Sequence, residues 1–353
     1  MAQLIEENIW FATLMLLVGF VFLVKGADFF VDGSSSVARR LKVPSIIVGL
    51  TIVAMGTSLP EAAVSVTASL ANNNTLAVSN VIGSNIFNSM VVVGACAAIT
   101  PIVVNPDTFR RDIPFSVICA LLLLLLGGIG MTVGHLDGAL LLFLFIGFLV
   151  NMVRLALRSR KDMEIGNGNS KIISEEVGRR DAPENDRKLS APENAEKKKE
   201  DDSVTLPVWR SLFYIVLGAV GIALGGDWVV DSASSIAVAA GMSQTLVGLT
   251  IVSIGTSLPE LVTSIVAAHK KEVDMALGNA FGSNVFNILM VLGIAAAISP
   301  VAFITENIID IVILIAMSLM IWIFAATRKQ ITRGEGLVMV LVYAVYVAYI
   351  IIR

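Results

Sequence analysis

Two glutamates lie in strongly apolar surroundings, and the same five residues precede each of them. The segment Gly-Thr-Ser-Leu-Pro-Glu occupies residues 56–61 and recurs at residues 255–260. A charged side chain in the middle of a membrane helix costs at least about 2.5 kcal/mol, so such a residue usually has a function. The proline before each glutamate frees the carbonyl oxygen four residues earlier, at Gly56 and Gly255. Because the motif combines a carboxylate with hydroxyl and carbonyl oxygens, it predicts a site for a hard cation.

Polar residues in a second pair of segments extend this set of oxygens. Ser84 and Asn88 are four residues apart, hence on one helix face, and Ser283 and Asn287 repeat the spacing. Together with two carboxylates they give a site of formal charge −2, which suits Ca²⁺ with its shell of about 6–8 oxygens. Na⁺ can use the same oxygens, whereas softer metals prefer sulfur or imidazole. Without a cation the two carboxylates repel each other, which favours obligatory exchange over leak.

Composition restricts the class of protein that can carry this site. The chain has 353 residues, of which 56% are hydrophobic and 15% charged, and its mean hydropathy is +0.83. A soluble domain is about 45–50% apolar and about 25% charged, so a soluble monomer is excluded. Two cysteines exclude a disulfide framework, two histidines disfavour a His-ligated metal enzyme, and a net charge of −3 disfavours a nucleic-acid partner. A polytopic protein of the lipid bilayer remains.

Apolar stretches long enough to cross a bilayer occur repeatedly along the chain. A bilayer core needs about 20 apolar residues per helix, and lipid tolerates only helices and closed barrels. The expected spans are 9–37, 44–70, 75–99, 112–132, 136–157, 208–238, 243–268, 274–298, 304–326 and 336–352. The predicted fold class is therefore an all-α polytopic membrane protein with ten transmembrane helices.

A polar segment divides the spans into two groups of five. Residues 1–158 form the first half, 159–207 a flexible linker rich in charged residues, and 208–353 the second half. An odd number of spans per half turns the second half over in the membrane, so the shared motifs indicate two inverted repeats, as in secondary transporters. Lys and Arg concentrate in alternate connections. The positive-inside rule then places the linker in the cytoplasm and both termini outside, in the plasma membrane of the cell.

The paired motifs resemble the alpha-repeats of the cation/calcium exchanger superfamily and are most similar to prokaryotic sodium/calcium exchangers. The resemblance rests on the two Gly-Thr-Ser-Leu-Pro-Glu segments and on Gly-Ser-Asn-x-Phe-Asn at residues 83–88 and 282–287. It implies exchange of about three Na⁺ for one Ca²⁺ by alternating access, in which spans one and six slide past the other eight. It implies no cofactor and no protein partner.

The resemblance also implies a role for each residue of the pattern. Glu61 and Glu260 would bind Ca²⁺ and share in Na⁺ binding, and Thr57 and Thr256 would contribute backbone carbonyls. The residues that would line the Na⁺ sites are Ser58, Ser84, Ser257 and Ser283, with the carbonyls of Ala54 and Ser253 near the outermost sites.

Two asparagines would face the central position of the site, Asn88 and Asn287. Several relatives, potassium-dependent members among them, carry Asp where this chain has Asn287. The Asn therefore indicates a central position with neutral ligands and exchange that does not depend on K⁺. Asn85 and Asn284 lie off the ligand face by about 100° per residue, and we assign them mostly to helix packing.

Other functions stay open at this point. An H⁺- or K⁺-coupled cation antiporter fits the same pattern, and a cation channel could use the same glutamates with no need for a counter-ion. A membrane-embedded aspartyl protease would need Asp28 and Asp227 to meet, whereas the repeat places them toward opposite faces. Asp28 and Asp32 recur as Asp227 and Asp231. We interpret them as interfacial hydrogen-bonding residues, with a cation funnel as the alternative.

Overall fold

Apolar helices form nearly all of the structure, a computed structural model that describes residues 9–71, 74–178, 206–242, 251 and 253–352. Within these residues, 8 helical segments are long and apolar enough to cross a membrane, and one bent pair makes up to 9. The segments are Ile9–Leu41, Leu76–Ile99, Thr108–Gly128, His135–Lys161, Val208–Ala239, Val273–Ile298, Thr305–Arg328 and Arg333–Ile352, with Ser45–Thr57 and Leu59–Leu70 as the bent pair. The prediction of an all-α polytopic membrane protein is confirmed.

The described helices form two sets, one before the polar segment and one after it. The first set is α2 (Ile9–Leu41), α3 (Ser45–Val48), the π-helical turn η1 (Gly49–Val53), α4 (Ala54–Thr57), α5 (Leu59–Leu70), α6 (Asn74–Phe87), the π-helical turn η2 (Asn88–Val92), α7 (Val93–Ile99), η3 (Thr108–Asp112), α8 (Ile113–Gly128) and α9 (His135–Gly178). The second set is α10 (Val208–Ala239), α12 (Ser253–Gly255), α13 (Leu258–His269), α14 (Val273–Phe286), the π-helical turn η5 (Asn287–Val291), α15 (Leu292–Ile298), α16 (Thr305–Arg328) and α17 (Arg333–Ile352). Single π-helical turns of this kind are frequent at functional sites.

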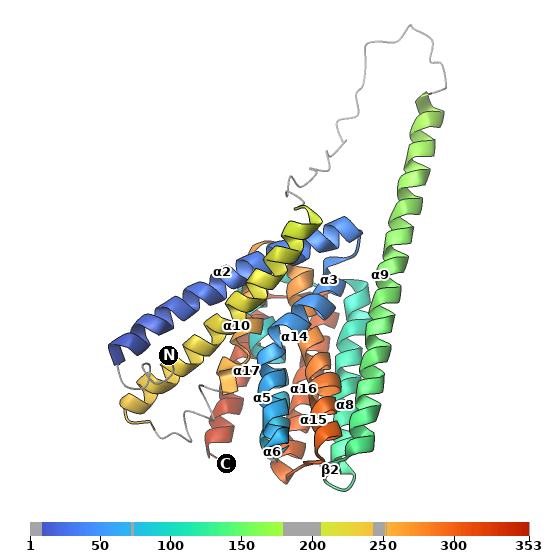
Figure 1. Cartoon of the computed structure of the whole chain (residues 1–353). Helices are drawn as coiled ribbons and strands as arrows, with labels where there is room; N and C mark the ends of the chain where they lie inside the picture. The colour runs from blue at the N-terminus through green and yellow to red at the C-terminus, as the bar shows by residue number, and fades with distance from the viewer. Residues whose placement is uncertain (1–8, 72–73, 179–205, 243–250, 252, 353) are drawn as a thin grey trace.

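One expected boundary differs from the structure, and a second falls outside the described residues. α9 continues to Gly178, so residues 159–178, which we expected to belong to the linker, are helical and extend beyond the bundle (Figure 1). The sequence lacks a proline from His135 to Gly178, so every residue there can donate its N–H to the helix. The expected span 243–268 begins in residues outside the described part, and its described portion is Ile251, α12 and α13.

Helices α2 and α10 form a pair that lies obliquely across the other helices (Figure 1). Glycines bring the two backbones together: a Cβ on Gly26 would lie 2.9 Å from the carbonyl oxygen of Gly218. Gly19 meets the carbonyl oxygen of Gly225 in the same way, and Gly33 meets that of Ser211. Because the partner numbers fall as the α2 numbers rise, the helices are antiparallel and pack backbone to backbone.

Helix α14 occupies the centre of the bundle and is buried over almost its whole length. Glycine again allows the close approach, since a Cβ on Gly282 would lie 2.7 Å from the Cα of Leu50 in η1. One turn earlier, Gly49 of η1 packs against Gly278 of α14, and a Cβ on either glycine would clash with the backbone of the other helical segment. This contact holds the segment that carries the first glutamate motif directly against α14.

Two short β-ladders join distant parts of the chain. β1 (Ile102–Val103) pairs with β4 (Gln330–Ile331), and β2 (Thr132–Val133) pairs with β3 (Val301–Ala302), both antiparallel. Each ladder links a connection before residue 158 to one after residue 208. The two halves of the sequence are therefore tied to each other outside the helices.

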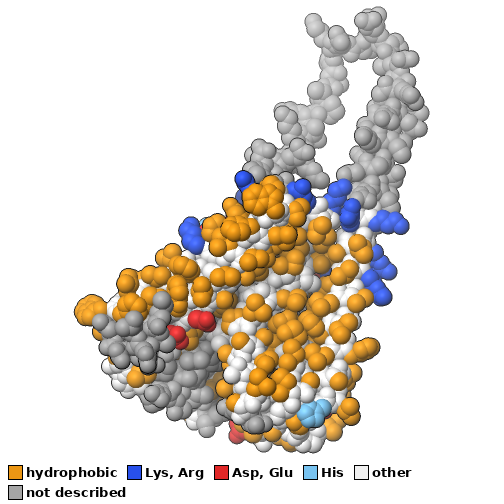
Figure 2. Space-filling view, viewed as in Figure 1, with side chains coloured by type: hydrophobic (Ala, Val, Ile, Leu, Met, Phe, Trp, Pro, Cys, Tyr) orange, Lys and Arg blue, Asp and Glu red, His pale blue; other side chains and the backbone are white. Residues whose placement is uncertain are grey.

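The surface has the character of a protein embedded in lipid. Apolar side chains cover most of the face in Figure 2, and Lys and Arg gather along its upper edge, where α2 ends with Arg39 and Arg40. Large apolar residues such as Phe143 and Leu341 are 70% and 64% exposed. Exposure on this scale indicates contact with hydrocarbon rather than water.

Candidate functional site

Each glutamate motif forms a break between two helices. The break at Ser58 (φ −84°, ψ 11°) bends the chain by 50° between α4 and α5, and Ser257 (φ −95°, ψ 5°) separates α12 from α13 in the same manner. Pro60 and Pro259 lie in the first turn of the helix that follows, where a missing N–H is tolerated. The breaks therefore expose hydroxyl and carbonyl oxygens in the interior of the bundle.

The two motifs bind each other crosswise. Ser257 donates its hydroxyl to Glu61 Oε1 at 3.0 Å, and Ser58 donates to Glu260 Oε1 at 2.7 Å. All four side chains are fully buried. The hypothesis that both acids meet in the interior is therefore supported by contacts in which each carboxylate accepts from the serine of the other motif.

The second pair of segments reaches the same place. Ser283 of α14 lies 2.9 Å from Ser58, Oγ to Oγ, so it joins the Glu260 side of the cluster. Thr57 bridges the halves as well, because its Oγ1 donates to Oδ1 of Asn279 at 3.1 Å. Ser84, Asn88 and Asn287 are all buried. Asn88 and Asn287 begin the π-helical turns η2 and η5, whose widened backbone follows directly on the polar faces of α6 and α14.

Several oxygens of this cluster have no hydrogen-bond partner within the described residues. They are Glu61 Oε2, Glu260 Oε2, Ser84 Oγ, Asn88 Oδ1 and Asn287 Oδ1. A buried polar atom without a partner costs about 1–3 kcal/mol, and more when the group is charged. Carboxylate, hydroxyl and amide oxygens that face the interior uncommitted are the donor set of a hard cation, and Na⁺ and Ca²⁺ fit them.

Three predicted ligands stand apart from this pattern. The carbonyl of Ala54 accepts the backbone N–H of Ser58 at 3.0 Å. Ser253 begins α12, and its side chain lies outside the described part. Thr256 is nearly buried and lines a cavity of about 280 Å³ together with Asp227 and Asp231.

The acidic pairs of α2 and α10 occupy different surroundings. Lys270, at the end of α13, lies 3.2 Å from Asp28 Oδ1 and 2.7 Å from Asp32 Oδ1. This agrees with the interfacial bonding that we expected for the first pair. The second pair, Asp227 and Asp231, borders the cavity that leads to Thr256, so a funnel for cations fits that pair better.

Sequence reasoning missed two asparagines that brace the glutamates. Asn80 donates to the carbonyl of Glu61 at 3.4 Å and to Ser65 at 3.0 Å. Asn279 donates to the carbonyl of Glu260 at 3.3 Å and makes the corresponding bond to its own serine. A signal was available, because Asn80 and Asn279 occupy matching positions in the two halves.

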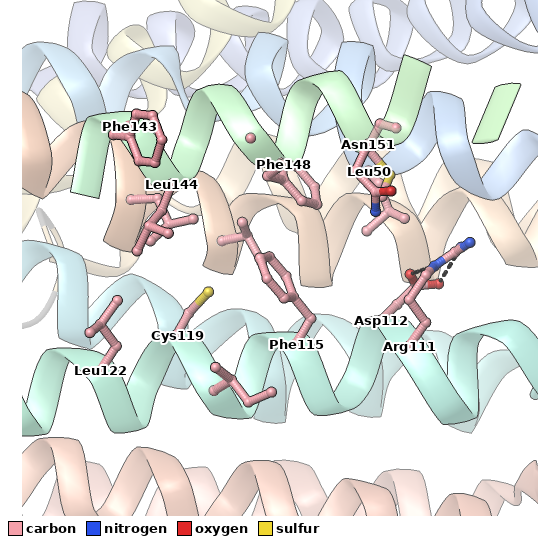
Figure 3. A pocket seen from close by; sticks show the side chains of 15 residues that line it. Leu50, Arg111, Asp112, Phe115, Cys119, Leu122, Phe143, Leu144, Phe148 and Asn151 are labelled. Atoms are coloured by element: carbon pink, nitrogen blue, oxygen red, sulfur yellow. Dashed lines mark hydrogen bonds and ion pairs between the residues drawn. The ribbon is translucent and has the colours of Figure 1, made fainter. Parts of the chain in front are cut away.

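A further cavity of about 320 Å³ lies between α8 and α9, away from this cluster (Figure 3). Phe115 and Phe148 stack within it at 5.4 Å between ring centroids, and the ion pair of Arg111 with Asp112 closes one end. None of the predicted cation ligands lines it. Most of its lining residues are apolar, so it is not part of the cation site.

Comparison with known proteins agrees with the geometry. A family model described as sodium/calcium exchanger protein matches residues 11–154 and 210–352. The putative antiporter CaxA of Alkalimonas amylolytica is 39% identical over 290 residues, which cover 82% of this chain and 81% of CaxA. The sodium/calcium exchanger MaX1 of Methanosarcina acetivorans is 30% identical over 356 residues, 94% of this chain and 96% of MaX1.

A solved structure has the same fold. The sodium-calcium exchanger NCX_Mj, soaked with Na⁺ and Sr²⁺, superposes with a TM-score of 0.76 at 29% identity, covering 97% of this chain and 99% of that chain. This likeness and the family match extend over both glutamate motifs. The chain therefore belongs to the sodium/calcium exchanger family and is an exchanger-type membrane antiporter, not an enzyme.

Proposed function

We propose that this protein exchanges about three Na⁺ for one Ca²⁺ across the plasma membrane by alternating access, independently of K⁺. The observation that carries the proposal is the crosswise pair of buried glutamates, each with one carboxylate oxygen bound to a serine of the other motif and one uncommitted. Such an exchange moves one net charge per cycle, so a membrane potential contributes about 2.3 kcal/mol per 100 mV.

In this proposal the two carboxylates hold Ca²⁺ at the centre of the cluster. Glu61 and Glu260 neutralise the divalent charge, and the backbone carbonyls of Thr57 and Thr256 add neutral oxygens. Asn88 and Asn287 face the same central position. Na⁺ occupies flanking positions built from the remaining ligands, which are Ser58, Ser84, Ser257, Ser283, Ala54 and Ser253. The competition of both ions for the same two carboxylates is what couples their movements.

The proposed architecture is ten transmembrane helices in two inverted five-helix repeats, 1–158 and 208–353, joined by the segment 159–207. The antiparallel pairing of α2 with α10 supports it, since both helices open their halves. The ladders support it too, because β1 pairs with β4 as β3 pairs with β2. A two-fold axis that exchanges the halves accounts for both observations.

Alternating access then requires that one side of the cluster be closed while the other is reachable. The cavity beside Thr256 and Asp227 lies along α10, whereas Lys270 and Arg39 tie α2 to the bundle at the basic edge where α2 ends. By the positive-inside rule that edge faces the cytoplasm, with both termini outside. We infer from this arrangement a form whose cation site is accessible from outside.

Transport in proteoliposomes tests the proposal. Vesicles loaded with Na⁺ should take up ⁴⁵Ca²⁺, and both Glu61→Gln and Glu260→Gln should abolish uptake, because each removes half of the site's charge. Glu306→Gln is the matched control, since Glu306 is an exposed glutamate in the first turn of α16. Uptake at the wild-type rate in both glutamine variants would remove the glutamates from the mechanism.

The choice of counter-ion is a separate measurement. Replacing internal Na⁺ by K⁺, Li⁺ or an H⁺ gradient should stop Ca²⁺ uptake if Na⁺ is the coupling ion. Uptake that requires K⁺ together with Na⁺ would contradict the interpretation of Asn287. Ca²⁺ flux that needs no internal counter-ion would identify a channel.

A further inference from the structure

Asn287 has two chemically different ends, and only one of them can bind a cation. Its side chain is fully buried, its Nδ2 donates to Oδ1 of Asn85 at 3.2 Å, and its Oδ1 has no partner within the described residues. An amide turned by 180° would present its N–H groups to the site, and these repel a cation. The orientation of this one amide therefore decides whether the central position has a ligand there.

A backbone carbonyl fixes that orientation. Asn85 donates Nδ2 to the carbonyl oxygen of Asn284 at 3.2 Å, and a carbonyl can only accept. The Asn85 amide is thus held with Oδ1 on its other side, toward Asn287. Because Oδ1 can only accept, Asn287 must offer its N–H to it. The oxygen of Asn287 is then the atom left over for the ion.

The matching residues in the other half are arranged differently. Asn284 corresponds to Asn85, but its Nδ2 donates to the hydroxyl of Ser89 at 2.9 Å. A hydroxyl can donate as well as accept, so this bond does not fix the amide. Asn88, which corresponds to Asn287, has no partner at either end within the described part of the chain. The difference originates in the sequence, because Ile288 stands at the position that matches Ser89.

We propose that Asn85 is a positioning residue that orients Asn287 as a fixed oxygen ligand, while Asn88 keeps an amide free to turn. The inference rests on the proposed function, in which Asn287 faces the transported ion. The two halves then contribute differently to the site. Asn287 in the second half presents its oxygen to the site before the ion binds, whereas the Asn88 amide in the first half turns when the ion binds. Asn85 thus does more than pack helices.

The test compares Asn287, whose side chain ends in one oxygen and one NH₂ group, with Asp, whose side chain ends in two oxygens. Asn85→Ala removes the acceptor for the Asn287 N–H groups, and we expect the Ca²⁺ concentration at half-maximal uptake to rise about tenfold, as for other residues that orient a metal ligand. In an Asn287→Asp background both ends of the side chain are oxygens, so no orienting partner is needed. There, adding Asn85→Ala should change half-saturation by less than about twofold.

Controls separate orientation from a loss of packing. Asn307→Ala removes another buried asparagine, which belongs to α16, bonds Ser79 in α6 and is not a predicted cation ligand, and it should leave half-saturation at the wild-type value. Ca²⁺-induced thermal stabilisation in detergent gives the same comparison without transport, and Asn85→Ser replaces Asn85→Ala if the alanine variant does not fold.

Two results would overturn the proposal. One is an unchanged half-saturation in both Asn85 variants, and the other is an Asn85→Ala effect of equal size with and without Asn287→Asp. Failure of the proposed function looks different, because Na⁺-driven Ca²⁺ uptake would then be missing in the wild type itself.

Discussion

Removal of the Lys270 side chain tests how the bundle opens. Lys270 Nζ lies 2.7 Å from Asp32 Oδ1 and 3.2 Å from Asp28 Oδ1, and it donates to the carbonyl of Asp28 at 3.0 Å. These contacts join the end of α13 to α2. The position that matches Lys270 in the first half is Ala71, so the first half has no lysine there. We expect Lys270→Met to favour separation of α2 from α13.

The size of the effect follows from the exposure of the three side chains. They are 29–49% exposed, so each ion pair contributes about 0.2–1 kcal/mol, as on a protein surface. Adding the charge-assisted bond to the carbonyl gives about 1–2 kcal/mol in total. The population of the separated form should therefore rise about 5- to 30-fold.

A cysteine placed between α2 and α14 measures that population. Ser35 is buried and its Oγ lies 3.9 Å from Met275 Sδ across this interface. The rate at which a hydrophilic maleimide modifies Ser35→Cys should increase about 5- to 30-fold when Lys270→Met is added. The native thiols Cys96 and Cys119 are both buried and contribute little background.

Lys271→Met is the matched control, because it removes the same charge one residue later. Labelling at an unchanged rate in Lys270→Met would refute the assignment of these ion pairs to closure. An equal increase in both variants would show that net charge, not the contact with Asp28 and Asp32, sets the rate.

Three shorter predictions follow from the packing and the site. Gly26→Val should lower the unfolding temperature, since its Cβ would lie 2.7 Å from the Ile222 backbone nitrogen. Gly128→Val should not, because there is open space around its Cβ. Equal unfolding temperatures of the two variants would contradict the close packing of α2 on α10. Ser257→Ala should raise the Ca²⁺ concentration at half-maximal uptake about tenfold through loss of the bond to Glu61, and an unchanged value would exclude that role. Deletion of residues 179–200 should leave uptake within about twofold of wild type, and complete loss would mean that this segment is more than a tether.

Much of this fold could be predicted because lipid limits the possibilities. Long apolar runs must be helices there, so helices such as α2 and α17 could be located from hydropathy alone. The glutamate motifs could be recognised as a site because charge in such runs is costly. The recurrence of the motif in the second half of the sequence pairs Glu61 with Glu260 without knowledge of their contacts.

Other features depend on contacts between residues far apart in the chain, which no local sequence pattern predicts. The crosswise bonds of Ser58 and Ser257 arise only when two distant helix breaks meet. The β-ladders are two residues long, too short for any periodic pattern. The C-terminal end of α9 is also hard to predict. A polar segment without proline can continue a helix as well as end it, and α9 continues to Gly178.

The glycine contacts between α2 and α10 have a mechanical consequence. At these contacts the backbone of α2 packs directly on the backbone of α10, with no side chain between them that could change rotamer. We therefore expect the two helices to move as one rigid pair. We expect a tilt of this rigid pair that lifts one end from the bundle to press the other end down. A passage that widens on one face of the membrane would then narrow on the other, and we expect no continuous pore to form through the molecule.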